Sequence, residues 1–99
     1  MWRNKKTEIF NNTEHSIVLM EMDRLVWGKE RLLLKKGESG EISIKNDQTY
    51  FQLGVLVRSN DRDEKTQLYI DQEELSDYKR IIISFDAEQK NFQVTREPS

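Results

Sequence analysis

The amino-acid sequence predicts an all-β fold, an antiparallel β-sandwich or partly open barrel of seven to eight strands. The first observation is a two-residue alternation of apolar and polar side chains, the period of a strand with one buried face. From Thr49 to Arg58 the odd positions hold Phe51, Leu53, Val55 and Val57. The second is a polar turn about every 8–12 residues, a spacing typical of sandwiches and barrels. Neither observation fits a helical fold, which needs apolar residues spaced by three and four.

The first half of the chain predicts three strands. A strand over Lys6–Asn11 should be followed by a turn at Asn11–Glu14, because asparagine favours turns. We expect that strand to pair with the next one, Ser16–Asp23. The apolar residues of Ser16–Asp23 occupy both faces of this second strand. The strand is therefore either central and covered on both faces, or its second face contacts something else. Leu32–Leu34 predicts another short strand, ended by glycines at 37 and 40.

The second half alternates more regularly. Besides 49–58, each predicted strand places two or three apolar residues on one face. A polar connection at 86–90 predicts a hairpin between the last two strands. Beyond 49–58, these segments are Glu41–Lys45, Gln67–Asp71, Ile81–Phe85 and Phe92–Val94.

One segment, near residues 71–78, predicts a short helical connection. Asp71 is a suitable N-cap, and Glu74 follows three residues later at the capping-box spacing. Acidic residues also crowd what would be the positive end of the helix dipole. We therefore expect one or two helical turns between two strands.

Composition predicts a single domain over residues 1–99, with flexible tails at 1–5 and 96–99. The chain has no cysteine, which removes disulfides, thiolate metal sites and a cysteine nucleophile. Its N-terminal segment lacks the apolar run of a signal peptide, and no run is long enough to cross a membrane. We therefore expect a cytoplasmic protein with no membrane partner.

Charge gives no sign of a nucleic-acid partner. Sixteen basic and eighteen acidic residues leave a net charge of −2, without a basic half. The nearest candidate for such contact is Trp2–Lys6, which we interpret as a solvated terminus.

No catalytic, cofactor or metal site is predicted, so we expect a protein that is not an enzyme. The single histidine, His15, falls in a predicted turn without a nucleophile motif around it. Gly37–Gly40 lacks the lysine and hydroxyl residue of a phosphate loop. Ser59–Glu64 gathers oxygen ligands that could bind calcium, although a polar hairpin loop explains the same residues.

The residues that the core least needs are aromatic, and they are our candidate partner-binding residues: Tyr50, Tyr69 and Trp27. We expect the fold to bury Trp27 and Leu56, whereas either burial or exposure suits the two tyrosines. Exposed tyrosine and tryptophan side chains are typical of protein interfaces. Together with the two-faced strand at 16–23, they favour a protein-binding or self-associating module. Unpaired edge strands would also invite self-association by strand addition, which gives a homodimer.

Two alternatives stay open. The first is a small-ligand module for an apolar molecule or a sugar, in which Met20 and Met22 could line a pocket. The second is an enzyme built from carboxylates alone, with a metal at Asp61 and Asp63.

Overall fold

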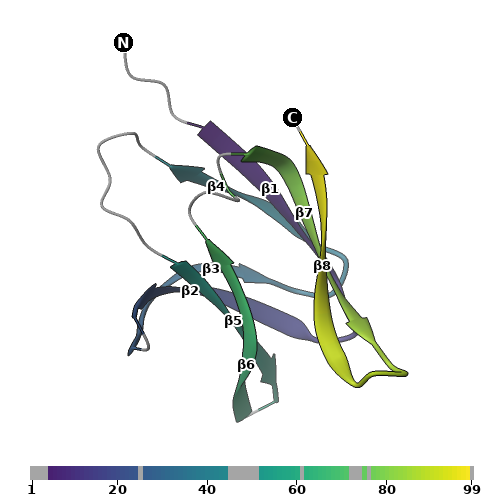
Figure 1. Ribbon diagram of the computed structural model, residues 1–99. Coiled ribbons are helices and arrows are strands. Elements are labelled where there is room, and N and C mark those ends of the chain that lie inside the picture. Colours follow the sequence, from purple (N-terminus) through teal and green to yellow (C-terminus); the bar gives the residue numbers. More distant parts are fainter. Residues whose placement is uncertain are drawn as a thin grey trace.

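The computed structural model describes residues 5–24, 26–44, 52–60, 62–71, 75 and 77–98. They form eight strands in two four-stranded sheets, which confirms the predicted sandwich (Figure 1). The strands are β1 (Lys5–Asn12), β2 (Ser16–Asp23), β3 (Val26–Leu34), β4 (Ser39–Ile44), β5 (Gln52–Ser59), β6 (Arg62–Asp71), β7 (Tyr78–Asp86) and β8 (Asn91–Pro98).

The two sheets have the strand orders β4-β1-β7-β8 and β3-β2-β5-β6. The strand pairs are antiparallel except β1 with β7, which run parallel. A parallel pair needs a long crossover connection, and here the chain builds the whole second sheet between β1 and β7. The β5–β6 and β7–β8 hairpins are both formed by neighbours in sequence.

The expected pairing of the first two strands is wrong, because β1 and β2 belong to different sheets. The chain crosses between the sheets after Asn11, whose side chain is fully buried. Its amide nitrogen donates to the carbonyls of His15 and Leu34 at 2.7 and 3.0 Å. Its amide oxygen accepts from the Thr13 backbone N–H and hydroxyl at 3.0 and 2.7 Å. Asn11 thus fixes a crossover instead of a hairpin.

The core lies between the sheets and follows the predicted alternation. In β5, Leu53 and Val55 are fully buried and Val57 is 8% exposed. Phe51, which continues the pattern, lies outside the described residues. The buried members of the central cluster are Ile9, Ile17, Leu19, Leu34, Ile42, Leu53, Val55, Ile70, Leu75, Ile81 and Ile83.

Much of the expected helical connection near 71–78 lies outside the described residues. Its two ends are strand residues, since Asp71 closes β6 and Tyr78 opens β7. Between them, the described residues Leu75 and Asp77 are helical, as expected, and Leu75 is buried in the core. The buried Thr7 hydroxyl donates to the carbonyl of Leu75, and that of Tyr78 lies 3.0 Å from it. This connection is therefore held against β1.

Several boundaries differ from the expected ones; β6, for example, begins at Arg62 and not at Gln67, so Asp63 and Glu64 belong to a strand and not to the expected loop at 59–64. β3 begins at Val26, so it is longer than the predicted strand at 32–34. Residues 96–98 belong to β8 and pair with β7, so the expected tail at 96–99 is wrong for these three. In β1, Lys5 is already part of the strand, whereas residues 1–4 and Ser99 lie outside the described part.

Candidate functional site

Two of the three candidate partner-binding residues meet on one face of the β3-β2-β5-β6 sheet. The ring centroids of Trp27 and Tyr69 are 6.3 Å apart, and the ring planes are inclined by 47°. Both side chains are partly exposed, so Trp27 is less buried than expected. Tyr50, the third candidate, lies outside the described residues. The structure thus forms one aromatic pair from two opposite edge strands, β3 and β6.

The pair forms because Gly54 leaves room for it. Tyr69 lies opposite Gly54 in the β5–β6 register, and Trp27 lies opposite Met22 in the β2–β3 register. A Cβ at Gly54 would come within 2.8 Å of two Trp27 ring atoms and 2.9 Å of the Met22 Sδ. The indole therefore extends from β3 across β2 and lies against the bare backbone of β5.

A cation completes this surface. The Lys65 Nζ lies 5.6 Å from the centroid of the Trp27 ring, within the range of a cation–π contact. We call Trp27, Lys65 and Tyr69 the aromatic patch. The sequence analysis missed Lys65 because the predicted strand began at Gln67, whereas β6 begins at Arg62 and places Lys65 on the same face as Tyr69.

Beside the aromatic patch, the same face of the sheet carries buried apolar side chains. Val18 and Leu56 lie opposite each other in the β2–β5 register, and both point away from the core between the sheets. Val18 is nevertheless fully buried, and Met22 and Leu56 are 3% and 5% exposed. The expected burial of Leu56 is confirmed. The second apolar face of β2 is thus covered on the outside of its sheet.

An ion-pair network occupies the other end of the same face. Arg58 of β5 bonds to Glu30 of β3 at 2.9 Å and, through two nitrogens, to both carboxylate oxygens of Asp63 at 2.9 and 3.0 Å. The hydrogen bond from Arg58 lowers the pKa of Asp63, and bonds to Asp63 and Glu30 raise the pKa of Arg58. Because β2 lies between β3 and β5, the Arg58–Glu30 bridge spans β2.

This network bears on the calcium alternative. Both carboxylate oxygens of Asp63 already accept hydrogen bonds from Arg58, which occupies the positions that a cation would use. Asp61, the other expected ligand, lies outside the described residues. Among the residues that are described, no group of three metal-binding side chains occurs.

The outer face of the other sheet has a different character. There Arg80 pairs with Glu8 at 2.7 Å and Glu97 at 3.7 Å, and its Cζ lies 5.2 Å from the Phe10 ring centroid. This arrangement is a polar network around one aromatic ring. The two outer faces of the sandwich therefore differ. In the described part of the chain, only one of them places two aromatic rings beside buried apolar side chains.

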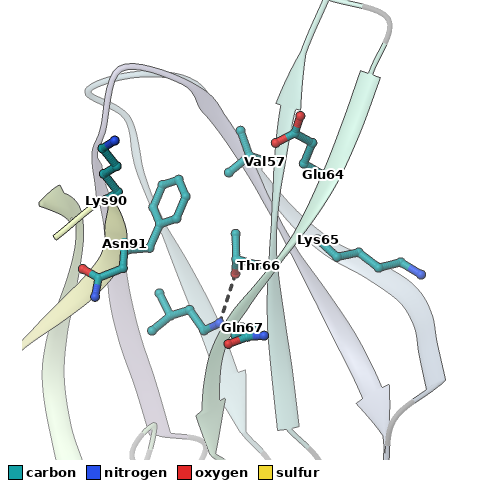
Figure 2. Close-up of a pocket in the computed structure, with 9 residues that line it drawn as sticks. Val57, Glu64, Lys65, Thr66, Gln67, Lys90 and Asn91 are labelled. Carbon is teal, nitrogen blue, oxygen red and sulfur yellow. Dashed lines mark hydrogen bonds between the residues drawn. The ribbon is translucent and has the colours of Figure 1, made fainter. Parts of the chain in front are cut away.

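A pocket of about 430 Å³ opens between β6 and β8 (Figure 2). Its apolar lining is Val57, Leu68 and Phe92, and its polar lining includes Glu64 and Lys90. Met20 and Met22, expected as possible lining residues, do not line it. Lys65 is also among the lining residues, and Figure 2 shows its side chain extending away from Lys90 and Asn91, in keeping with its position over Trp27.

His15 is exposed in the turn between β1 and β2, as a turn histidine should be. Its backbone carbonyl accepts from the Asn11 amide and lies 3.0 Å from the Thr13 hydroxyl. Within the described residues, no helix is long and apolar enough to span a membrane.

Comparison with known proteins gives a family but no described activity. Searches of curated proteins and of solved structures find no significant match. Residues 5–99 match the model of a domain of unknown function, DUF7748, over nearly the whole chain. The chain therefore belongs to the DUF7748 family.

Proposed function

We propose that the protein is a non-catalytic binding module that associates with another protein, or with a second copy of itself, and that the aromatic patch is a contact surface. One observation carries the proposal. The fold brings Trp27, Tyr69 and Lys65 to one partly exposed site on a sheet face. Tryptophan and tyrosine supply large contact areas with few rotatable bonds, so they lose little conformational entropy on binding.

The surroundings of the patch favour a preformed surface. Gly54 fixes the position of the Trp27 ring, and the tilted contact with Tyr69 supports it from β6. A surface that is already ordered loses less freedom when a partner binds. Lys65 contributes a positive charge beside the rings, so the matching partner surface carries an acidic side chain next to an apolar one.

The test compares a patch variant with a matched variant on the opposite face. The immobilised full chain captures proteins from its source cells, and Tyr69→Ser and Lys65→Glu each reduce that capture. Phe10→Ser removes an aromatic ring from the outer face of the other sheet and leaves capture unchanged. Thermal melting confirms that each variant is folded. Capture that survives both patch substitutions, or the absence of any specific partner, contradicts the proposal.

A small-ligand module is the second candidate, and the pocket between β6 and β8 favours it. Its volume of about 430 Å³ lies within the usual range for small-molecule sites. Val57, Leu68 and Phe92 offer an apolar floor, and Lys90 at the rim suits an anionic group. Octanoate is a fitting probe, with methyl glucoside to represent the sugars. Amide NMR shifts confined to β6 and β8 support the site, whereas unchanged spectra with both probes oppose it.

We also propose a cytoplasmic setting without a nucleic-acid or membrane partner. The support is the cysteine-free composition and the balanced charge of the chain. A fluorescent fusion distributed through the cytoplasm agrees with this setting, and accumulation at a membrane or on chromosomal DNA contradicts it.

A further inference from the structure

We infer that the free edge of β8 pairs with β8 of a second copy, antiparallel and around a two-fold axis at Val94. The two β4-β1-β7-β8 sheets then form one continuous sheet across the dimer. This inference rests on the self-association half of the proposed function and assigns a surface to it. It uses a different part of the molecule from the aromatic patch, so the two are tested separately.

The two sheets have four edge strands: β4, β8, β3 and β6. Exposed edges invite pairing with another chain, and proteins guard them with charges, bulges, proline or short strands. β3 carries two irregularities in its pairing with β2 and the consecutive charged residues Lys29, Glu30 and Arg31. These features of β3 therefore oppose its pairing with a strand of another chain.

β6 and β4 are guarded as well. The pairing of β6 with β5 is irregular between Gly54 and Leu56, and its first residues, Arg62–Lys65, are all charged. β4 has six residues, Ser39–Ile44, and is the shortest of the described strands. Each of these three edges therefore has at least one feature that opposes strand addition.

β8 has the least protection of the four. Its register with β7 is continuous from Glu97 opposite Arg80 to Asn91 opposite Asp86, and the one shift in this pair lies beyond that stretch, between Tyr78 and Arg80. The stretch Asn91–Thr95 contains no charged residue and no proline. The guarding residues, Arg96, Glu97 and Pro98, come only at its end. A regular, uncharged edge of this kind is the surface on which a further strand can add.

The side chains of β8 are also complementary to those of β8 in a second copy. A two-fold axis perpendicular to the sheet keeps each side chain opposite one on the same face. An axis at Val94 places Gln93 opposite Thr95 of the second copy, and Asn91 opposite Glu97. Phe92 then faces Arg96, the remaining charged residue, and Pro98 lies outside the paired stretch.

No like charges face each other in this arrangement. In β3, by contrast, an axis at residue 29, 30 or 31 sets identical charges opposite each other, which is destabilising. Charge thus permits self-pairing through β8 and opposes it through the middle of β3.

The inner face of β8 is also incompletely covered. Ile81 and Ile83 of the neighbouring β7 are fully buried. Phe92 and Val94 of β8 pack against the same core but stay partly exposed. Phe92 also lines the pocket between β6 and β8, so the sandwich is open along this side. An added strand places a second Val94 beside the first and Arg96 of the second copy opposite Phe92, so it covers this open side of the layer.

The test is light scattering coupled to size exclusion, over a range of concentrations of the full chain. One chain has a mass of 11.9 kDa, so the expected dimer is twice that, about 24 kDa. Gln93→Lys/Thr95→Lys places lysines opposite each other across the axis and abolishes the dimer. Ser39→Lys/Glu41→Lys places two lysines on the other edge of the same sheet and leaves the dimer intact. Both pairs of positions are exposed, so folding is retained.

A charge-complementary variant tests the register itself. Gln93→Lys/Thr95→Glu sets opposite charges across the axis and restores the dimer that the double-lysine variant loses. Because the chain has no cysteine, Val94→Cys should also give a disulfide-linked dimer on mild oxidation, whereas Thr95→Cys should not. Thr95 lies one residue from the axis, so it is offset by two residues from the second Thr95, too far for a disulfide.

The outcomes separate this inference from the proposed function. A wild-type chain that is monomeric at every concentration overturns the inference, and capture of a different protein through the aromatic patch is still tested by Tyr69→Ser. A dimer that survives the double-lysine change and is lost in Tyr69→Ser also overturns it, but assigns self-association to the aromatic patch. A dimer insensitive to both sets of variants contradicts the inference and the patch as a dimer contact.

Discussion

Replacing Asn11 with alanine should destabilise the fold by about 3–4 kcal/mol, a large effect for one polar residue. Asn11 is fully buried at the crossover between the sheets, and its side chain takes part in four hydrogen bonds. The alanine variant leaves the Leu34 carbonyl and the Thr13 N–H without these partners, and a protein interior offers little water to replace them.

The magnitude follows from counting those bonds. A net hydrogen bond contributes about 1 kcal/mol, and a buried partner left unsatisfied costs about 1–3 kcal/mol. Four bonds therefore give about 4 kcal/mol. The Thr13 hydroxyl lies 3.0 Å from the His15 carbonyl and can donate there instead, which reduces the loss. Natural domains have only about 5–15 kcal/mol to lose, so the variant should still fold but be visibly weaker.

The assay is equilibrium unfolding in urea, followed by circular dichroism. Because m-values for small domains are about 1–3 kcal/mol per molar urea, the midpoint should fall by about 2 M. Asn12→Ala is the matched control, since Asn12 is exposed and its amide makes only a 3.5 Å contact with the Ser84 hydroxyl. It should change the free energy of unfolding by less than about 0.5 kcal/mol. Equal effects for the two variants, or a loss below about 1 kcal/mol for Asn11→Ala, would refute the crossover argument.

Three further predictions concern the core, the aromatic patch and the ion pairs. Ile81→Ala should cost about 2–5 kcal/mol of unfolding free energy, because it opens a cavity in a fully buried position; a loss under about 1 kcal/mol would contradict the packing. Gly54→Val should displace the Trp27 ring and cost about 1–3 kcal/mol, seen by urea unfolding and by a shift in indole NMR signals, and an unmoved indole would argue against their contact. Because Arg58 lowers the pKa of Asp63 below its ordinary 3.8, the Asp63 carboxylate stabilises the fold above that pH and the contribution is lost as the pH falls through the lowered value. Asp63→Asn should therefore flatten the acid limb of the stability–pH curve, and an unchanged limb would count against this pairing.

The position of each strand could be predicted at least in part from the sequence, whereas the full extent of the edge strands β3 and β6 could not. β5 is central and alternates in the way its burial requires, so Leu53 and Val55 were assigned correctly. The first part of β3 is an edge with two pairing irregularities and three adjacent charged residues, which erase the period of two. Its extent therefore follows from tertiary pairing and not from local pattern.

The topology is the part that local patterns do not contain. The sequence near Asn11 predicts a turn, and a turn is present, but a hairpin and a crossover have similar turn residues. The difference lies in where the Asn11 side chain points, towards carbonyls of β3 and of the following turn. That direction depends on residues far along the chain.

The residues of the candidate site could be predicted from the sequence, but their arrangement on one surface could not. Tyr69 could be selected because an outward-facing aromatic residue is unusual on an alternating strand, and Trp27 because it fell between two predicted strands. Their meeting over Gly54, and the position of Lys65 above the indole, depend on the register of three strand pairs. Gly54 carries the only local signal for this contact, since glycine in the middle of a strand often marks a close approach.

Site-specific photo-cross-linking at Tyr69 tests the binding role most directly. A benzophenone-bearing phenylalanine analogue at position 69 keeps an aromatic ring on the patch, and the same analogue at Phe10 serves as control on the opposite outer face. Illumination in the source cells should give a discrete protein adduct from position 69 and none from position 10. Equal adducts from both positions, or none from position 69, would contradict the assignment of this face as the contact surface.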